Sequence, residues 1–143
     1  MDVCDLCAYT YNLQFAYSLW SDRARIPEFM PAVRSVQVDK DDPRKSIWTL
    51  VASAFDREWS LSWTARNLTP LPNHKLHWVS EDGVKNKGAV RFTSTRGGGC
   101  RARLSIEYEC PEPLVPFANL LAPVVQRLLD DSLLKFKVRI LCT

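Results

Sequence analysis

The sequence predicts one α+β domain, in which a long C-terminal helix packs on one face of an antiparallel β-sheet. Two observations support this fold class. Residues 33–108 contain several short runs with an apolar period of two, which is typical of strands, and residues 117–138 have an apolar period of helical type. The strand runs follow one another without helices between them, so the order favours a sheet with a helix against it over a βαβ arrangement.

Length and composition limit the alternatives. The 143 residues fit a single domain spanning 1–143, with enough chain to bury a core. A hydrophobic content of 46% with 24% charged residues is typical of globular proteins and favours neither a disordered chain nor a coiled coil. The net charge of +3 is too small to indicate nucleic-acid binding by itself.

The first helix is predicted near the N-terminus. Thr10 or Asn12 can cap it, and Leu13, Ala16, Tyr17 and Trp20 then recur at helical spacing to form one apolar face. The helix ends near Ser21, and a short helical turn over residues 23–25 precedes Pro27.

The strands are predicted from alternation. It is clearest in residues 58–66, where Trp59, Leu61, Trp63 and Ala65 alternate with polar residues. The other predicted strands lie in residues 33–38, 47–52, 74–80, 88–94 and 100–108. One solvated face indicates an antiparallel sheet. Pro111, Pro113 and Pro116 then interrupt the chain before the long helix.

No stretch of the sequence has the 18 or more apolar residues of a membrane-spanning helix. The start of the chain has the features of neither a secretory signal nor an organelle transit peptide, so we expect a cytosolic protein or an already trimmed sequence. Five cysteines, an odd and scattered number, favour a reducing compartment over a disulfide framework.

Several landmarks occur together and in order along the chain. They are Trp20-Ser21-Asp22, Ile26-Pro27-Glu28-Phe29-Met30, Trp48, Trp63, Pro72-Asn73, Trp78, Asn86-Lys87-Gly88-Ala89-Val90-Arg91-Phe92 and Tyr108-Glu109-Cys110-Pro111. From about Ala8 to Lys137 the chain resembles the polyketide cyclase/dehydrase and lipid-transport (SRPBCC) branch of the START-like superfamily. The stretch from Pro72 to Pro116 resembles most closely members from plants, algae and cyanobacteria. This implies a plastid (chloroplast) protein, soluble or peripheral to the thylakoid membrane.

The resemblance implies a helix-grip (START/Bet v 1-like) fold, in which a curved sheet of six to seven strands wraps around the last helix and encloses an apolar cavity. Relatives use this cavity for lipids, quinones, hormones or polyketides. The inward residues that would form the wall are Trp48, Leu50, Trp59, Leu61, Trp63, Trp78, Phe92, Leu104, Ile106 and Tyr108 on the strands and Leu121, Val125, Leu128 and Leu129 on the helix. They either line a void or fill it as ordinary core. The family's first strand is expected to be short or missing here, because only Val3 to Ala8 is available and Asp5 interrupts it. The sheet edge would then be open.

Catalytic and metal sites are not predicted. His74 and His77 fall on opposite faces of one strand, and no spacing joins them to a serine or carboxylate. Glu58, Glu107 and Glu109 fall on outward or end positions. Cys4-x-x-Cys7 lacks the further ligands that zinc needs, so neither a metal nor a cofactor is expected.

A basic patch is predicted on the outer face of the sheet. It comprises Lys85, Lys87, Arg91, Arg101 and Arg103, with Arg96 nearby and no acidic residue between Val84 and Ile106. It would either face solvent or meet an anionic lipid surface or an acidic protein surface. Nucleic acid is not expected, because no exposed aromatic platform accompanies these cations. Residues 96–99 are predicted to form a flexible hairpin tip that helps to gate the cavity.

Three functions follow. The first is non-catalytic binding or presentation of a hydrophobic small molecule, such as a lipid, an isoprenoid quinone or a pigment, near a membrane. The alternative is an accessory scaffold subunit of a larger photosynthetic or respiratory membrane complex, and the second alternative is a polyketide-type cyclase or dehydratase. A carrier should have a cavity of several hundred cubic ångströms. A scaffold could have that cavity plugged by tryptophan and leucine side chains. An enzyme should place His74, His77 or Tyr108 in the cavity with a hydrogen-bond partner.

Overall fold

The computed structural model describes the chain except for residues 1, 11–12, 95, 97–99 and 142–143, and describes only the backbone of residues 2–10, 133 and 137–141. The elements in order are β1 (Asp2–Thr10), α1 (Leu13–Ser21), the 3₁₀ helix η1 (Arg23–Glu28), β2 (Val33–Val38), β3 (Lys45–Ala54), β4 (Arg57–Asn67), β5 (Lys75–Gly83), β6 (Asn86–Ser94), β7 (Cys100–Tyr108), the 3₁₀ helix η2 (Glu112–Phe117) and α2 (Ala118–Leu141).

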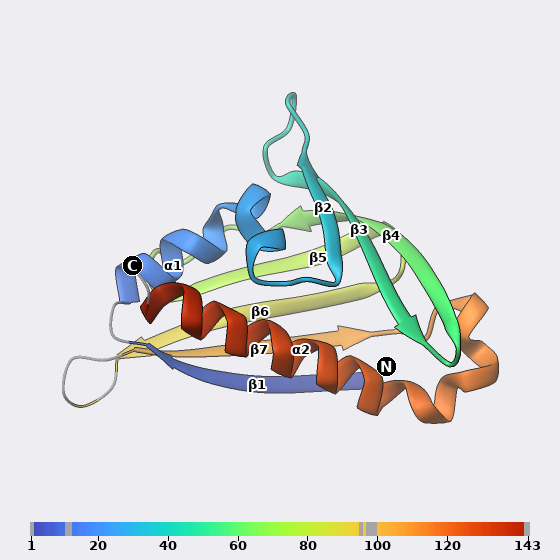
Figure 1. Cartoon of the computed structure of the whole chain (residues 1–143). Coiled ribbons are helices and arrows are strands. Elements are labelled where there is room, and N and C mark those ends of the chain that lie inside the picture. Colours follow the sequence, from blue (N-terminus) through green and yellow to red (C-terminus); the bar gives the residue numbers. More distant parts are fainter. Residues whose placement is uncertain (1, 11–12, 95, 97–99, 142–143) are drawn as a thin grey trace.

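The seven strands form one antiparallel sheet in the order β1-β7-β6-β5-β4-β3-β2. The sheet curves, and α2 lies along it close to β1, while α1 and η1 lie over its other end (Figure 1). The predicted α+β class and the helix-grip arrangement are therefore confirmed.

The prediction of a short or missing first strand was wrong. β1 pairs with β7 without a break from Asp2, opposite Tyr108, to Thr10, opposite Cys100. Asp5 does not interrupt the ladder, because inter-strand hydrogen bonds are made by backbone groups that every residue other than proline supplies. The sheet edge that the missing strand would have left open at β7 is covered by β1.

The curvature of the sheet follows from the unequal pairing of β4 with its two neighbouring strands, β3 and β5. β4 pairs with β3 along its whole length, but it pairs with β5 only through Trp63–Asn67, with a bulge between Thr64 and Ala65. Bulges bend a strand and increase its twist. The β3–β4 hairpin therefore swings away from β5 towards η2 (Figure 1), which opens a space beneath the hairpin.

A cluster of buried aromatic residues lies at the opposite end, beneath α1. Here Trp20, Phe29 and Phe136 form a cluster, the aromatic core, with ring centroids 4.9 to 5.2 Å apart. Ala16 and Leu19 of α1 are buried in the same apolar cluster. This packing holds α1 and the second half of α2 together on the sheet. Among the described residues, no helix has an apolar run long enough to cross a membrane.

Candidate ligand cavity

A cavity of about 210 Å³, partly open to solvent, lies between the concave face of the sheet, α2 and the α1–η1 segment. The structure places all the predicted wall residues along it except Phe92: Trp48, Leu50, Trp59, Leu61, Trp63, Trp78, Leu104, Ile106, Tyr108, Leu121, Val125, Leu128 and Leu129. The cavity is smaller than the several hundred cubic ångströms expected, because indole rings and the leucines of α2 occupy part of the space. Contact of these residues with a ligand stays a prediction.

Phe92 does not line the cavity, which corrects the prediction for this residue. It is only 1% exposed, and its ring packs edge-on against Tyr17 of α1, with centroids 5.6 Å apart. Alternation along β6 places Phe92 on the inner face, but α1 covers that part of the sheet. Inward strand positions under α1 are therefore core, and only those beyond it are free to line a void.

All five tryptophans of the chain line the cavity. Three have a hydrogen-bonded indole: Trp48 Nε1 donates to Ser46 Oγ, Trp59 Nε1 to the Ala54 carbonyl and Trp78 Nε1 to Asn86 Oδ1, each at 2.9 Å. These bonds fix the orientation of the rings, so the apolar faces that they present are preorganised.

The remaining two tryptophans differ. The buried Nε1 atoms of Trp20 and Trp63 have no hydrogen-bond partner among the described residues. A buried donor without an acceptor costs about 1–3 kcal/mol. The indole N–H groups of Trp20 and Trp63 are therefore uncompensated donors on residues of the cavity wall.

Neighbouring strands position the rings. Trp48 and Trp63 lie directly opposite each other on β3 and β4, and their rings stack with centroids 5.8 Å apart. Trp78 lies against Gly88 of β6, where a Cβ atom would come within 2.6 Å of the indole. Gly88 is thus the residue that leaves room for the Trp78 ring.

One end of the cavity is closed by aromatic contacts between the β3–β4 turn and η2. Phe55, which lines the cavity, stacks on Phe117 with centroids 4.5 Å apart, and Trp59 meets Phe117 edge-on. Phe55 and Asp56 form the two-residue turn with φ of 55° and 60°. A left-handed conformation costs a residue with a side chain roughly 1–2 kcal/mol. The Phe55–Phe117 contact offsets that strain.

The α1–η1 segment supplies wall residues that were not predicted, namely Trp20, Arg23, Ile26 and Met30. The sequence predicts wall residues only on the strands and the last helix. The signal was present, because these four residues recur at steps of three or four and so continue the inner face of α1 into η1.

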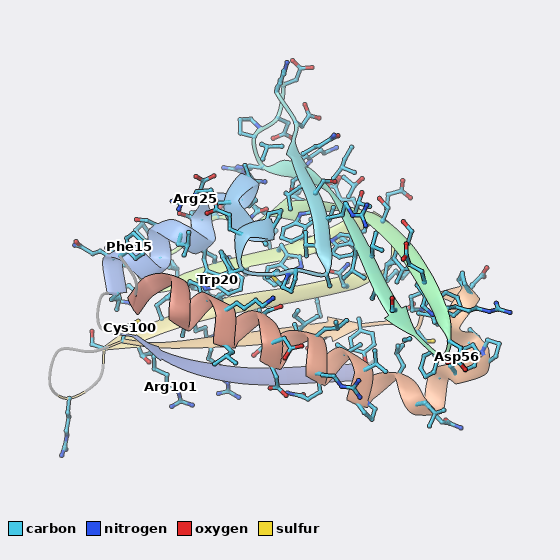
Figure 2. All side chains as sticks on the ribbon, viewed as in Figure 1. Phe15, Trp20, Arg25, Asp56, Cys100 and Arg101 are labelled. Atoms are coloured by element: carbon cyan, nitrogen blue, oxygen red, sulfur yellow. The ribbon has the colours of Figure 1, made fainter. Side chains whose placement is uncertain are left out.

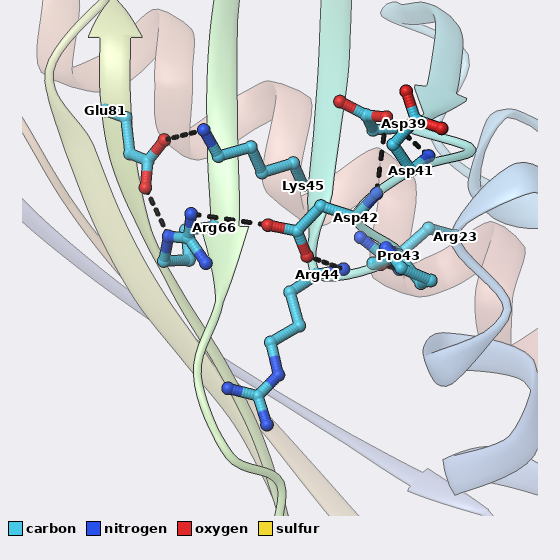
Figure 3. Close-up of polar contacts among 9 residues, drawn as sticks. All are labelled: Arg23, Asp39, Asp41, Asp42, Pro43, Arg44, Lys45, Arg66 and Glu81. Carbon is cyan, nitrogen blue, oxygen red and sulfur yellow. Dashed lines mark hydrogen bonds and ion pairs between the residues drawn. The ribbon is translucent and has the colours of Figure 1, made fainter.

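Arg23 is the only charged residue among the described residues that line the cavity. Its Nη1 donates to Asn67 Oδ1 at 3.2 Å, and its Nη2 donates to the Pro43 carbonyl of the β2–β3 turn, beside which Figure 3 shows it. Burial lowers the pKa of the Arg23 guanidinium. The polar residues Asn86 and Ser132 also line the cavity, and their side chains bond within the protein.

Of the three candidate catalytic residues, His74, His77 and Tyr108, only Tyr108 lies at the cavity. His74 and His77 do not line the cavity, and the His77 ring bonds to the Thr69 carbonyl. Tyr108 does line it. The side chains of Cys4 and Cys7 and the hairpin tip at 97–99 lie outside the described residues, and no metal-binding cluster occurs in the part of the chain that the structure describes. The described wall therefore contains no histidine or carboxylate.

The predicted basic patch lies on β6, β7 and the turns beside them. Lys85 and Lys87 pair with Glu109 and Glu107, at 4.0 and 3.4 Å. These acids come from just beyond the acid-free stretch and reduce the net charge of the patch. Arg91 lies opposite Arg103 on β7 and opposite Lys75 on β5, which forms a row of three cations across the sheet. Arg101 lies opposite Thr93, next to Cys100 at the start of β7 (Figure 2).

Comparison with known proteins places this cavity in a family. The family model described as "Polyketide cyclase / dehydrase and lipid transport" matches residues 10–137. The chain belongs to this family. The match includes all of the described cavity wall, from Trp20 to Ser132. No curated protein sequence matches the chain.

Solved structures confirm the family's fold. A protein from Deinococcus radiodurans is 25% identical, with a TM-score of 0.73, over 99% of this chain and 100% of its own. A START superfamily protein from Mycobacterium smegmatis is 13% identical (TM-score 0.70, 96% of each chain). The ZhuI aromatase/cyclase from a Streptomyces species is 12% identical (TM-score 0.74, 97% and 93%). Closeness to plant, algal and cyanobacterial members, and with it the plastid location, stays a prediction.

Proposed function

We propose that the chain binds one hydrophobic small molecule, such as a lipid, an isoprenoid quinone or a pigment, and carries or presents it unchanged. The observation that supports this most directly is the cavity itself, about 210 Å³ with five tryptophans and mostly aliphatic side chains in its wall. Ligand pockets are typically roughly 300–1,000 Å³. The space therefore suits a compact ring system or part of one acyl chain.

The wall favours binding over chemistry. Cyclisation and dehydration need an acid or base that touches the substrate, and the described wall holds neither a histidine nor a carboxylate. Tyr108 is the one candidate from the sequence that lines the cavity. An open sheet edge at β7 would favour the scaffold alternative, because a partner could dock there. The complete β1 covers that edge, so this feature does not favour a scaffold.

Presentation near a membrane is a finer proposal, which rests on the row formed by Lys75, Arg91 and Arg103. Cations gathered on one face of a sheet attract an anionic lipid surface. Sedimentation with anionic and zwitterionic vesicles tests it. Binding to anionic vesicles alone, weakened by salt and by Arg91→Gln, is expected; equal binding to both would contradict it.

The binding proposal is tested with the neutral fluorescent probe N-phenyl-1-naphthylamine. We expect a saturable rise in probe emission together with quenching of the tryptophans, because all five lie at the cavity. The variant Ala52→Leu fills the cavity from β3 and should abolish both signals, whereas Ser53→Leu, on the neighbouring exposed position, should not. Absence of saturable binding to the unaltered protein would contradict the proposal.

A further inference from the structure

Arg23 is unusual among the described cavity residues because it brings a cation to an otherwise uncharged wall. It is the first residue of η1, separated from α1 only by Asp22, and η1 packs against β2 at the edge of the cavity. The side chain is half-buried. A charge withdrawn from water in this way needs a partner to be stable.

The partners that the structure gives Arg23 are neutral. Its hydrogen bonds go to Asn67 Oδ1 and to the Pro43 carbonyl, and no carboxylate among the described residues pairs with it. Other arginines do have acidic partners: Arg25 pairs with Glu28 at 2.9 Å, and Arg66 pairs with Asp42 at 3.5 Å and with Glu81. The charge of Arg23 is therefore not compensated within the described protein.

Acidic residues do occur in the adjacent β2–β3 turn, but Asp39 and Asp42 bond to other partners. Asp39 accepts from the backbone N–H groups of Asp41 and Asp42. Asp42 pairs with Arg66 and also accepts from the backbone N–H of Arg44 (Figure 3). The turn therefore supplies the Pro43 carbonyl to Arg23, and no counter-charge.

The guanidinium keeps donors for a ligand. Arginine has five N–H groups in a planar fork, and the two bonds to Asn67 and Pro43 leave about three of them. Trp20, one turn earlier in the same segment, lines the same cavity with an indole N–H that has no partner among the described residues. The remaining N–H groups of Arg23 and the indole N–H of Trp20 thus lie on one segment without acceptors among the described residues. Such a set of donors matches an oxyanion better than a neutral group.

From this arrangement we infer that the cavity selects an apolar molecule bearing a carboxylate, whose oxygens accept hydrogen bonds from Arg23 and whose apolar body lies against the tryptophans. Arginine and carboxylate are complementary in shape and charge, and their paired hydrogen bonds are among the strongest in proteins. Asn67 holds the guanidinium in place through its Oδ1. The inference rests on the proposed binding function and narrows its ligand class.

The test displaces N-phenyl-1-naphthylamine from the protein with decanoate or with decan-1-ol, below their aggregation concentrations, at pH 7.5. The alcohol is the more hydrophobic of the two, so a purely apolar cavity would favour it. We expect decanoate to be preferred by about tenfold, the size of one charge-assisted hydrogen bond. Arg23→Gln should reduce or reverse this preference, while Arg23→Lys should keep part of it.

Arg25→Gln is the matched control, because it removes the same charge two residues away, on η1, from a side chain that does not line the cavity (Figure 2). It should leave the preference unchanged. Equal binding of the acid and the alcohol, or an equal effect of both arginine variants, would overturn the inference while the neutral probe still binds. If the probe itself fails to bind the unaltered protein, the proposed function fails and the inference fails with it.

Discussion

Two aromatic regions of the molecule have similar compositions and opposite packing. The aromatic core beneath α1 is almost fully buried: Trp20, Phe29 and Phe136 are exposed by 5%, 0% and 0%, and of these three only Trp20 also borders the cavity. Trp48, Trp59 and Trp63 on the β3–β4 hairpin, the tryptophan wall, are only half-buried and face the cavity. Figure 2 shows the two ends of the molecule, with Trp20 near one end and Asp56 of the β3–β4 turn at the other.

The difference comes from what covers each region. At the closed end, α1, η1 and the second half of α2 meet, and their rings pack edge-on and tilted. At the other end the hairpin diverges from β5 while α2 stays beside β1. Aromatic residues therefore make a core or a binding wall according to the elements above them.

The largest expected effect is the loss of stability when a leucine side chain is truncated to alanine in each of the two regions. Leu19→Ala in the closed end should lower the free energy of unfolding by about 2–5 kcal/mol, because it leaves a new cavity among packed atoms. Leu61→Ala, in the wall, should cost less than about 2 kcal/mol, because its side chain already borders a void. Urea unfolding measures both. Equal losses would mean that the wall is packed like the core.

A larger side chain should be tolerated at the cavity and not in the aromatic core. Ala16→Leu, at a fully buried position on the inner face of α1, should destabilise the protein by about 1–3 kcal/mol, since a packed core resists extra volume. Ala52→Leu, at the cavity, should leave stability unchanged or raise it. Thermal unfolding of the two variants compares them directly, and a loss with Ala52→Leu as large as that with Ala16→Leu would argue against a void at this site.

A finer prediction separates the two stacked tryptophans. Trp48→Phe removes the bond to Ser46 and leaves that buried hydroxyl without its indole donor. Trp63→Phe removes an N–H that has no partner among the described residues. Both changes remove the same volume, so Trp48→Phe should be the more destabilising by about 1 kcal/mol. Denaturation curves with equal slopes are needed for the comparison, and an equal loss in both variants would contradict the assigned bonds.

The smallest effect concerns the ion pairs, which lie outside both aromatic regions. Hydrogen bonds from Arg66, then from Lys45, lower the pKa of Glu81 (Figure 3). Because the pKa of Glu81 is lowered in the folded state, its ion pairs stabilise the fold at pH values above the ordinary carboxyl pKa. This stabilisation is lost as the pH falls through the lowered pKa. Glu81→Gln should therefore lower the melting temperature slightly at pH 7 and not at pH 2. A constant difference across that range would mean that the pairs do not contribute through charge.

Sequence reasoning reached most of the fold and the strand side of the cavity. Alternation located Trp48, Trp59 and Trp63 correctly on one face, because a pleated strand fixes that face regardless of what covers it. Alternation could not show that α1 would cover Phe92, since that depends on tertiary packing. It also missed β1, whose ladder depends on backbone hydrogen bonds that side-chain patterns do not report.

The polar end of the cavity was missed for a different reason. Arg23 follows the first helix in a segment with a proline, which predicts a boundary and not a wall. Its role depends on the meeting of η1, the Pro43 turn and the end of β4 at Asn67. These segments are far apart in the chain, and no local pattern joins them.

The most direct test of the central claim is native mass spectrometry of the protein purified gently from its own source, followed by organic extraction of the same sample. The account predicts one bound hydrophobic molecule per chain, released intact on extraction. A chain that carries no small molecule and arrives instead as part of a large assembly would contradict the binding function and favour a scaffold role.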